Sequence, residues 1–324
     1  MSESKLGFIL RRMTTKKEII LHHYPASPYS ERVRLFLGYK KATWTSVVTP
    51  VTLPKPDQTI LTGGYRRAPV LQIGSDIYCD SRLIIEELNR ILPEPPISIE
   101  NADAASANLF AELVDTDIFL KVAKFVMGSY AQKLPQELVD DRAAMQPQEK
   151  LTRENMEKLV PYLHLSLSKI LPEFAMSLAK KQFFGGEIPA RGDFAIYQIF
   201  WFLNTIRKFK PLVPGHENLH EWFARMKTFG AGESTLLSAE DALKTAAASS
   251  PIPIHSTNVL PEPYDLKAGQ EVIVHPENYD HERIFGKLIH LDDERIVLAN
   301  ESPKTGLVHV HFPRLRYLVL PKTF

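Results

Sequence analysis

The spacing of apolar residues changes twice along the chain and divides it into three regions. From Glu18 to about Asn89, short β-branched runs alternate with helical patterns. From about Ala102 to Thr245 apolar residues recur every three or four positions, and beyond Tyr264 the period becomes two. A chain of 324 residues suits two or three domains. The predicted fold is therefore α+β, with a mixed first domain, an all-helical second domain and a small β-barrel-like third domain.

The order of elements in the first region is typical of a thioredoxin-like domain. The pattern predicts a strand over Glu18–His22, a helix over Ser30–Lys40 and a second strand over Thr43–Val48. It then predicts a hairpin of two strands, Val70–Ile73 and Ile77–Cys79, and a last helix over Asp80–Asn89. A stretch rich in proline and glycine, with one short helix near Asp57, separates the second strand from the hairpin. Asp80 and Ser81 are both good N-cap candidates for the last helix.

Helices dominate the second region. They are predicted over Ala104–Tyr130, Leu151–Leu178 and Asp193–Arg207, and Pro172 is expected to kink or break the second of them. The third is apolar on almost every face, which indicates burial at the centre of a bundle. Phe110, Phe119 and Trp201 are the candidate aromatic residues for an acceptor pocket, although helix aromatics more often form plain core.

Short strands dominate the third region. Five are predicted, over Glu271–His275, Arg283–His290, Arg295–Ala299, Val308–Phe312 and Leu315–Leu320. They suggest a small barrel that cannot bury a large core by itself. We expect a structural or binding appendage without a catalytic residue, docked on the helical domain with the proline-rich segment as a strap. His309 and His311 share one strand face near His275, His281 and His290, and we expect solvated histidines there and no metal site.

Proline-rich segments mark the boundaries between these regions. Leu92–Pro96 is a stiff connector, and Ser249–Pro263 contains four prolines. The chain is accordingly divided into an N-terminal extension (1–17), a thioredoxin-like domain (18–98), a helical domain (99–248), a linker (249–263) and a β-barrel-like domain (264–324).

Composition excludes several functional classes. The formal net charge is +1 and the basic residues form no block, so no field favours nucleic acid. No apolar run is long enough to span a bilayer, and no membrane association is expected. Cys79 is the only cysteine, so no intramolecular disulfide can form, which suits a reducing, cytoplasmic environment. We expect Cys79 to be a buried packing thiol rather than a nucleophile.

The first chemical signal is the segment from Tyr24 to Arg34, which follows the first strand and opens the first helix. It reads Tyr-Pro-Ala-Ser-Pro-Tyr-Ser-Glu-Arg-Val-Arg. A helix N-terminus offers unpaired N–H groups and partial positive charge, so a thiolate is stabilised there. Ser27 could add a hydrogen bond to a ligand's sulfur. The simpler alternative is that Ser27 or Ser30 only caps the helix.

Two further segments strengthen this signal. Arg67 to Gly74 places Pro69 just before a strand, and Cys79 to Ile84 places Asp80 and Ser81 at a helix start. The simpler alternatives are an ordinary proline at a strand start and a double helix cap.

Together the three segments resemble the glutathione S-transferase family, over about Glu18 to Thr245. The resemblance implies that Ser27 lies at the active-site turn. It also implies a cis Ala68–Pro69 bond that presents the backbone of Val70 or Ala68 to the cysteinyl part of glutathione. Asp80 would then meet the α-ammonium of glutathione, and Ser81 with its helix N-terminus would meet the α-carboxylate.

The resemblance also leaves choices open. Arg66, Arg67 or Lys55 could hold the glycyl carboxylate of glutathione. The implied activity is a glutathione-dependent transferase acting on a small hydrophobic electrophile, without a metal, in a homodimer. The alternatives are an isomerase, lyase or dehalogenase that uses glutathione, or a non-catalytic binding protein of the same fold, since serine at the turn does not separate them.

Two features depart from the family pattern. The segment before the buried third helix has Ala190 where the family usually has Ser or Thr, while Asp193 is kept three positions later. Half of that capping box is therefore missing. The C-terminal β region is not part of the usual pattern either.

Overall fold

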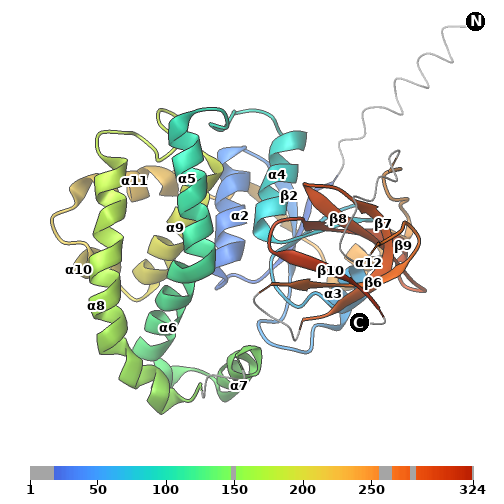
Figure 1. The fold of residues 1–324 in the computed structure, drawn as a ribbon, viewed down its shortest axis with the longest axis horizontal. Coiled ribbons are helices and arrows are strands. Elements are labelled where there is room, and N and C mark those ends of the chain that lie inside the picture. The colour runs from blue at the N-terminus through green and yellow to red at the C-terminus, as the bar shows by residue number, and fades with distance from the viewer. Residues whose placement is uncertain (1–17, 147–150, 255–264, 278–281, 323–324) are drawn as a thin grey trace, which may run out of the picture.

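The computed structural model describes residues 18–146, 151–254, 265–277 and 282–322; the predicted N-terminal extension and most of the linker lie outside these residues. Helices form one half of the molecule and β-strands the other (Figure 1). Between them lie the helices of the thioredoxin-like domain, α2 (Pro28–Tyr39) and α4 (Ser81–Ile91).

The first domain has the predicted thioredoxin-like order. Its strands are β1 (Ile20–His23), β2 (Thr43–Val48), β3 (Val70–Ile73) and β4 (Asp76–Cys79), and α3 (Pro56–Thr62) precedes β3. Strand β1 pairs in parallel with β2 and antiparallel with β3, and β3 pairs antiparallel with β4. Helix α2 begins where Pro28 fixes its first turn, and α4 begins where Asp80 caps it.

The second domain is helical, with one irregularity that periodicity did not predict. The expected single helix over Ala104–Tyr130 is divided into α5 (Ala102–Leu113) and α6 (Phe119–Ser129) by a π-helical turn, η1 (Val114–Ile118). Pro172 does not break α8, which runs unbroken over Arg153–Leu178. The remaining helical segments are η2 (Ala131–Lys133), α7 (Gln136–Met145), α9 (Arg191–Thr205), α10 (Phe209–Leu212), α11 (Glu217–Lys227) and α12 (Ala239–Ala247).

The missing half of the capping box at α9 is replaced by longer-range contacts. Asp193 is fully buried and accepts hydrogen bonds from the N–H groups of Phe184, Gly185 and Ala190 at 2.7, 3.0 and 2.9 Å. The indole N–H of Trp222 adds a fourth at 2.9 Å. One carboxylate therefore satisfies the loop before α9 without a hydroxyl at Ala190.

The third region contains the five predicted strands, but they do not form a separate module. They are β6 (Glu271–Pro276), β7 (Ile284–Leu291), β8 (Arg295–Ser302), β9 (Gly306–Pro313) and β10 (Tyr317–Pro321). Strand β9 pairs in parallel with β4, so both β regions share one ten-stranded sheet, ordered β10-β6-β7-β8-β9-β4-β3-β1-β2-β5.

The prediction that this region docks on the helical domain holds only for its smaller contacts, with α12 and with Glu112 of α5. Its main contact is the β9–β4 pairing with the first domain, and a single hydrophobic cluster contains Leu61, Val70 and Ile77 of the first domain together with Leu298 and Val310 of the third. The first domain is the main partner because β4 ends that domain's own pairing at an open edge, and an open edge favours another strand. Helix α12 also packs in this cluster through Leu243 and Ala246.

Two further expectations are corrected by the sheet. The second region is not purely helical, because β5 (Glu233–Leu236) extends the sheet beside β2. The expected solvated histidine face is also wrong: His311 is 5% exposed, bonds Asp76 at 3.1 Å and stacks on Tyr78. Helix α4 packs over β9 on this side, and the resulting burial lowers the pKa of His311. His281 lies outside the described residues.

No helix among the described residues is long and apolar enough to cross a membrane. Within the same residues, no group of three or more His, Cys, Asp or Glu side chains is placed to hold a metal.

Candidate active site

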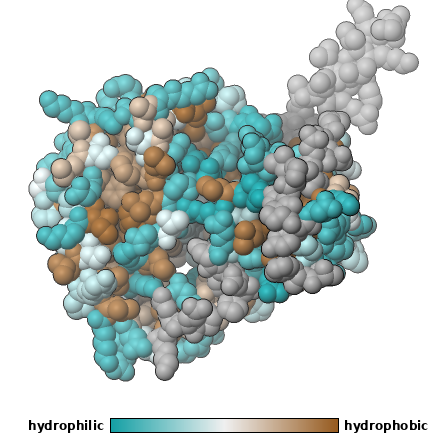
Figure 2. Space-filling model, in the orientation of Figure 1, coloured by the Kyte–Doolittle hydropathy of each residue, from teal (hydrophilic) through white to brown (hydrophobic). Residues whose placement is uncertain are grey.

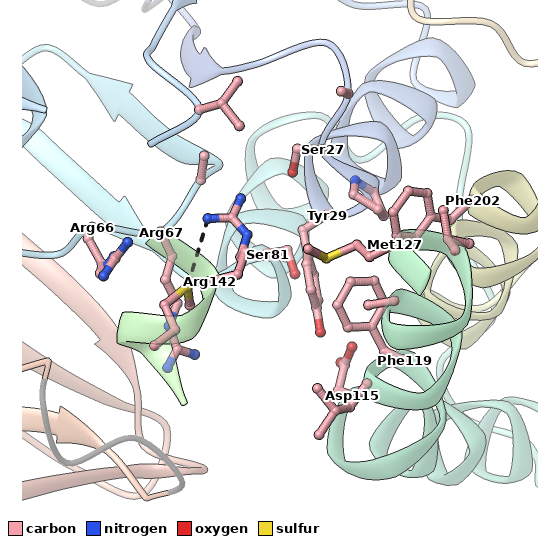
Figure 3. Close-up of a pocket in the computed structure, with 18 of the residues that line it drawn as sticks. Ser27, Tyr29, Arg66, Arg67, Ser81, Asp115, Phe119, Met127, Arg142 and Phe202 are labelled. Carbon is pink, nitrogen blue, oxygen red and sulfur yellow. Dashed lines mark hydrogen bonds between the residues drawn. The ribbon is translucent and has the colours of Figure 1, made fainter. Parts of the chain in front are cut away.

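The described residues form a pocket of about 880 Å³ where the three domains meet. It collects five of the six residues that the sequence marked as site residues: Ser27, Arg67, Pro69, Asp80 and Ser81. Figure 3 shows the labelled residues around one space, with Phe119, Met127 and Phe202 on one side and Arg66, Arg67 and Arg142 on the other. The pocket therefore has an apolar side and a cationic side.

Ser27 lies at the N-cap of α2 and faces this pocket. Its Oγ accepts a hydrogen bond from the N–H of Ser30 at 3.1 Å, so Ser27 does cap the helix, as the simpler alternative expected. That bond uses the oxygen as an acceptor and leaves the hydroxyl hydrogen able to donate. Capping and ligand binding are therefore compatible at Ser27.

The two arginines of the Arg-Val-Arg sequence support the turn. Arg34 donates to the carbonyls of Tyr24 and Pro25 at 3.3 and 2.9 Å, which fixes the segment before Ser27. Arg32 is fully buried and pairs with Asp115 of η1 at 3.0 Å. This pair joins α2 to the helical domain, and Asp115 lines the pocket.

The loop before β3 has the predicted cis bond. The Ala68–Pro69 peptide is cis, and both residues line the pocket. Val70 does not: its side chain is fully buried in the shared core, and β3 pairs there with both of its neighbouring strands. Of the two alternatives that the sequence left open for backbone contact with a ligand, the structure brings Ala68 to the pocket.

Asp80 and Ser81 begin α4 at the pocket wall. Asp80 has a left-handed backbone, with φ of 77°, and one carboxylate oxygen caps the helix by accepting from the N–H of Arg82 at 2.8 Å. The other oxygen accepts from the hydroxyl of Tyr317 at 3.1 Å. A carboxylate has about four acceptor positions, so Asp80 can accept further hydrogen bonds from a ligand.

A cationic loop lies beside the cis proline. Lys55 donates to the carbonyl of Arg66 at 2.9 Å, and the guanidinium of Arg66 pairs with Asp141 of α7 at 2.6 Å. Arg67 pairs with Glu282 at 2.7 Å. Burial, followed by the nearby charges of Arg142 and Arg66, lowers the pKa of Lys55 to about 8. Lys55, Arg66 and Arg67 together place positive charge on this side of the pocket, which suits an anionic ligand.

The helical domain supplies the apolar wall. Phe119, Leu120 and Met127 of α6 line it with Phe202 of α9, and Phe119 packs on Tyr29 at 4.6 Å. Of the three aromatic candidates from the sequence, Phe119 lines the pocket and the other two do not. Figure 2 shows apolar residues gathered over this helical half of the molecule.

Sequence reasoning missed several pocket residues because no local pattern marks them. Arg142 projects from α7 and lies 3.5 Å from the hydroxyl of Tyr24. Arg316 and Tyr317 reach the pocket from the third domain. Cys79, in contrast, is fully buried as expected, and burial raises the pKa of its thiol well above the usual value, which makes it unreactive.

Comparisons with known proteins agree with this architecture. Residues 21–96 match the glutathione S-transferase N-terminal domain, and residues 116–228 match the C-terminal domain. A GST-like protein from Pseudomonas syringae is 31% identical, with a TM-score of 0.72, over 93% of this chain and 99% of its own. No curated protein sequence matches the chain significantly.

More distant solved structures share the fold alone. A theta class glutathione S-transferase from Xanthomonas axonopodis pv. citri, solved with glutathione bound, is 14% identical with a TM-score of 0.50 and covers 65% of this chain and 93% of its own. A glutathione S-transferase from Rhodospirillum rubrum is 16% identical with a TM-score of 0.51, covering 65% and 88%. The extent of the first similarity and the two matched domains show that the chain belongs to the glutathione S-transferase family.

Proposed function

We propose that the chain binds glutathione in this pocket and uses its sulfur as the nucleophile toward a small hydrophobic electrophile. The observation that carries the proposal is the position of Ser27, at the N-cap of α2 and facing the pocket, with its hydroxyl hydrogen able to donate. A sulfur beside Ser27 receives that hydrogen bond and the partial positive charge of the helix. Both favour the thiolate over the thiol.

The reaction then needs little more from the protein. The thiol proton leaves to solvent when glutathione binds. The thiolate forms a bond to an electrophilic carbon, and the leaving group departs with its electron pair. Ser27 contributes by lowering the free energy of the thiolate and by holding the sulfur in place.

The γ-glutamyl and glycyl ends of glutathione each bind groups of complementary charge. Asp80 accepts from the α-ammonium, while Ser81 and the N-terminus of α4 bind the α-carboxylate. The backbone of Ala68 pairs with the cysteinyl unit beside Pro69. Arg67, with Arg66 and Lys55, lies on the cationic side of the pocket and suits the glycyl carboxylate.

The acceptor binds on the opposite side of the pocket. Phe119, Met127 and Phe202 form an apolar wall that removes a hydrophobic molecule from water. Because this wall lies opposite the cationic side of the pocket, the two substrates are separated by polarity.

Calorimetry and turnover assays test the proposal in sequence. Titration of the full chain with millimolar glutathione should give saturable heat, and its absence would end the proposal. Assays on several electrophile classes should then show glutathione consumed in proportion to product. Release of unchanged glutathione would instead indicate an isomerase, lyase or dehalogenase, and binding without turnover would indicate a non-catalytic member.

Two expectations about the state of the protein belong to the same proposal. We propose a homodimer formed through the first two domains, since closed two-fold pairing is the commonest arrangement of soluble homo-oligomers. Sedimentation at micromolar concentrations tests it, and a monomer mass throughout would contradict it. A single cysteine favours a reducing, cytoplasmic location.

A further inference from the structure

The third domain contacts Asp80 at the wall of the candidate glutathione site. The hydroxyl of Tyr317, at the start of β10, donates to one oxygen of Asp80 at 3.1 Å. The other oxygen accepts from the N–H of Arg82 at 2.8 Å. One restraint on the carboxylate is therefore local, and the other comes from 237 residues further along the chain.

The backbone around this contact is held on both sides. Asp80 has φ of 77°, and Arg316, the residue before Tyr317, has φ of 69°. Left-handed backbone is unfavourable for residues other than glycine and persists where the surroundings impose it. The guanidinium of Arg316 pairs with Glu112 of α5 at 2.6 Å, and its carbonyl accepts from the N–H of Glu277 at 3.0 Å. The turn that carries Tyr317 is thus fixed to two other elements.

The ring of Tyr317 is held separately from its hydroxyl. It is 2% exposed and packs on Phe312 with ring centroids 5.5 Å apart, within the core shared by the first and third domains. Removal of the hydroxyl should therefore leave the ring in place. Burial raises the pKa of Tyr317 well above its usual value, so the hydroxyl stays a donor at every pH of interest.

We infer that Tyr317 is a positioning residue for glutathione, which orients the Asp80 carboxylate toward the α-ammonium of the γ-glutamyl unit. The inference rests on the proposed function. A carboxylate's terminal torsion has broad energy wells, so one local hydrogen bond alone leaves it free to turn. The second bond, from Tyr317, limits that rotation and directs the remaining acceptor positions into the pocket. The third domain is in this way a part of the glutathione site rather than an appendage.

A pair of ligands isolates this role. The full chain and its Tyr317→Phe variant are titrated by calorimetry with glutathione and with an analogue whose γ-glutamyl unit is replaced by glutaryl, which lacks the α-amino group. The variant should bind glutathione about tenfold more weakly, the scale of one charge-assisted hydrogen bond. It should bind the glutaryl analogue as the wild type does, because no ammonium meets Asp80.

Matched variants complete the test. Tyr162→Phe makes the same chemical change on α8 at a side chain 66% exposed and outside the pocket lining, and it should alter neither affinity. In a chain that already carries Asp80→Ala, Tyr317→Phe should cause no further loss of glutathione affinity. A thermal unfolding curve for each variant establishes that it is folded.

The possible results separate this inference from the proposed function. Equal weakening of both ligands would show that Tyr317 only supports the pocket wall, and unchanged glutathione affinity would show no role; either overturns the inference alone. Absence of glutathione binding by the wild type would overturn the proposed function and this inference together. A loss of affinity in Tyr317→Phe that affects glutathione and not the glutaryl analogue would support both the proposed function and this inference.

Discussion

The first and third domains contribute strands to one sheet and residues to one pocket, but in different ways. The first domain places Ser27, Asp80 and Ser81 at helix N-termini, where the groups that line the pocket are set by neighbours in sequence. The third domain places Tyr317 and Glu282 against residues of the first, through contacts far apart in sequence. The pocket-lining groups of the first domain thus follow local rules, whereas the third-domain groups that contact this domain depend on how the strands pair.

Removal of the third domain should give the largest effect. Truncation after Pro253 exposes the edge of β4 and uncovers Leu61, Val70 and Ile77, each worth about 1.5–3 kcal/mol of burial. The sum approaches the whole stability of an ordinary domain. We expect the truncated chain to aggregate or to lose its cooperative unfolding transition in circular dichroism. A truncated chain that folds and binds glutathione normally would show that the third domain is a separate module.

Substitution of Ser27 tests the pocket-lining groups of the first domain. Ser27→Ala should lower the conjugation rate about 10²- to 10³-fold, as for loss of one hydrogen bond to a developing anion. The pH–rate profile should move to higher pH, because the bound thiol loses its donor. Stability should fall by only about 1 kcal/mol for the lost cap.

Ser30→Ala is the matched control for that experiment, since its hydroxyl is buried in the same helix turn. It should leave the pH–rate profile unchanged. If the two variants exchange these results, the role assigned to Ser27 belongs to Ser30.

Substitution of Glu282 tests the third-domain groups that support the first domain. Glu282 is 3% exposed, accepts from the N–H of Arg66 at 2.8 Å and pairs with Arg67. Glu282→Gln should reduce the free energy of unfolding by about 1–3 kcal/mol, because it takes the counter-charge from the partly buried guanidinium of Arg67. Glutathione affinity should fall several-fold as the loop before Pro69 loosens.

Denaturant unfolding and calorimetry measure these two changes. Glu294→Gln, at an exposed position of the same domain, is the control and should change neither. Should Glu282→Gln lower stability without any loss of affinity, the loop would be shown to hold its shape independently of the third domain.

The smallest effect concerns the charge of Lys55. Its pKa is lowered to about 8, so the free protein loses this positive charge as pH rises through 8. An anion bound beside it favours the charged form, so affinity for the anion is full below pH 8 and falls above it. Lys55→Arg keeps the charge at every pH used.

S-methylglutathione, which has no thiol to ionise, is the ligand for this comparison. The ratio of the wild-type to the Lys55→Arg affinity should fall about three- to tenfold between pH 7 and 9.5. Ionisation of the ligand cancels in the ratio. A ratio independent of pH would remove Lys55 from the glycyl carboxylate site.

Periodicity predicted much of the fold and failed where long-range contacts decide. The strands of the first and third domains lie close to their predicted positions, because alternation and turn residues are local signals. The π-helical turn in Ala104–Tyr130 has no such signal; its Asp115 pairs with the buried Arg32. Strand β5 was missed because Glu233–Leu236 is exposed throughout and shows no alternation of burial.

The sequence alone determined which chemical groups stand at the helix starts. Ser27 and Asp80 cap the first N–H groups of their helices, and Ser81 is the first residue of α4. Every helix N-terminus has unpaired N–H groups that need acceptors, so these positions follow from local sequence. The cis bond at Pro69, in contrast, was implied by the resemblance of its segment to the glutathione S-transferase family, and the structure has it. The groups at the helix starts need no knowledge of the rest of the chain.

Only the tertiary structure decided which residues support them. The parallel pairing of β9 with β4 brings the third domain to the first, and Tyr317 and Glu282 reach the site as a result. A strand carries its side-chain alternation in the sequence but not the identity of its partner, because main-chain hydrogen bonds are the same for every edge. For that reason the sequence predicted the β-strands of the third domain and not the pocket that they reach.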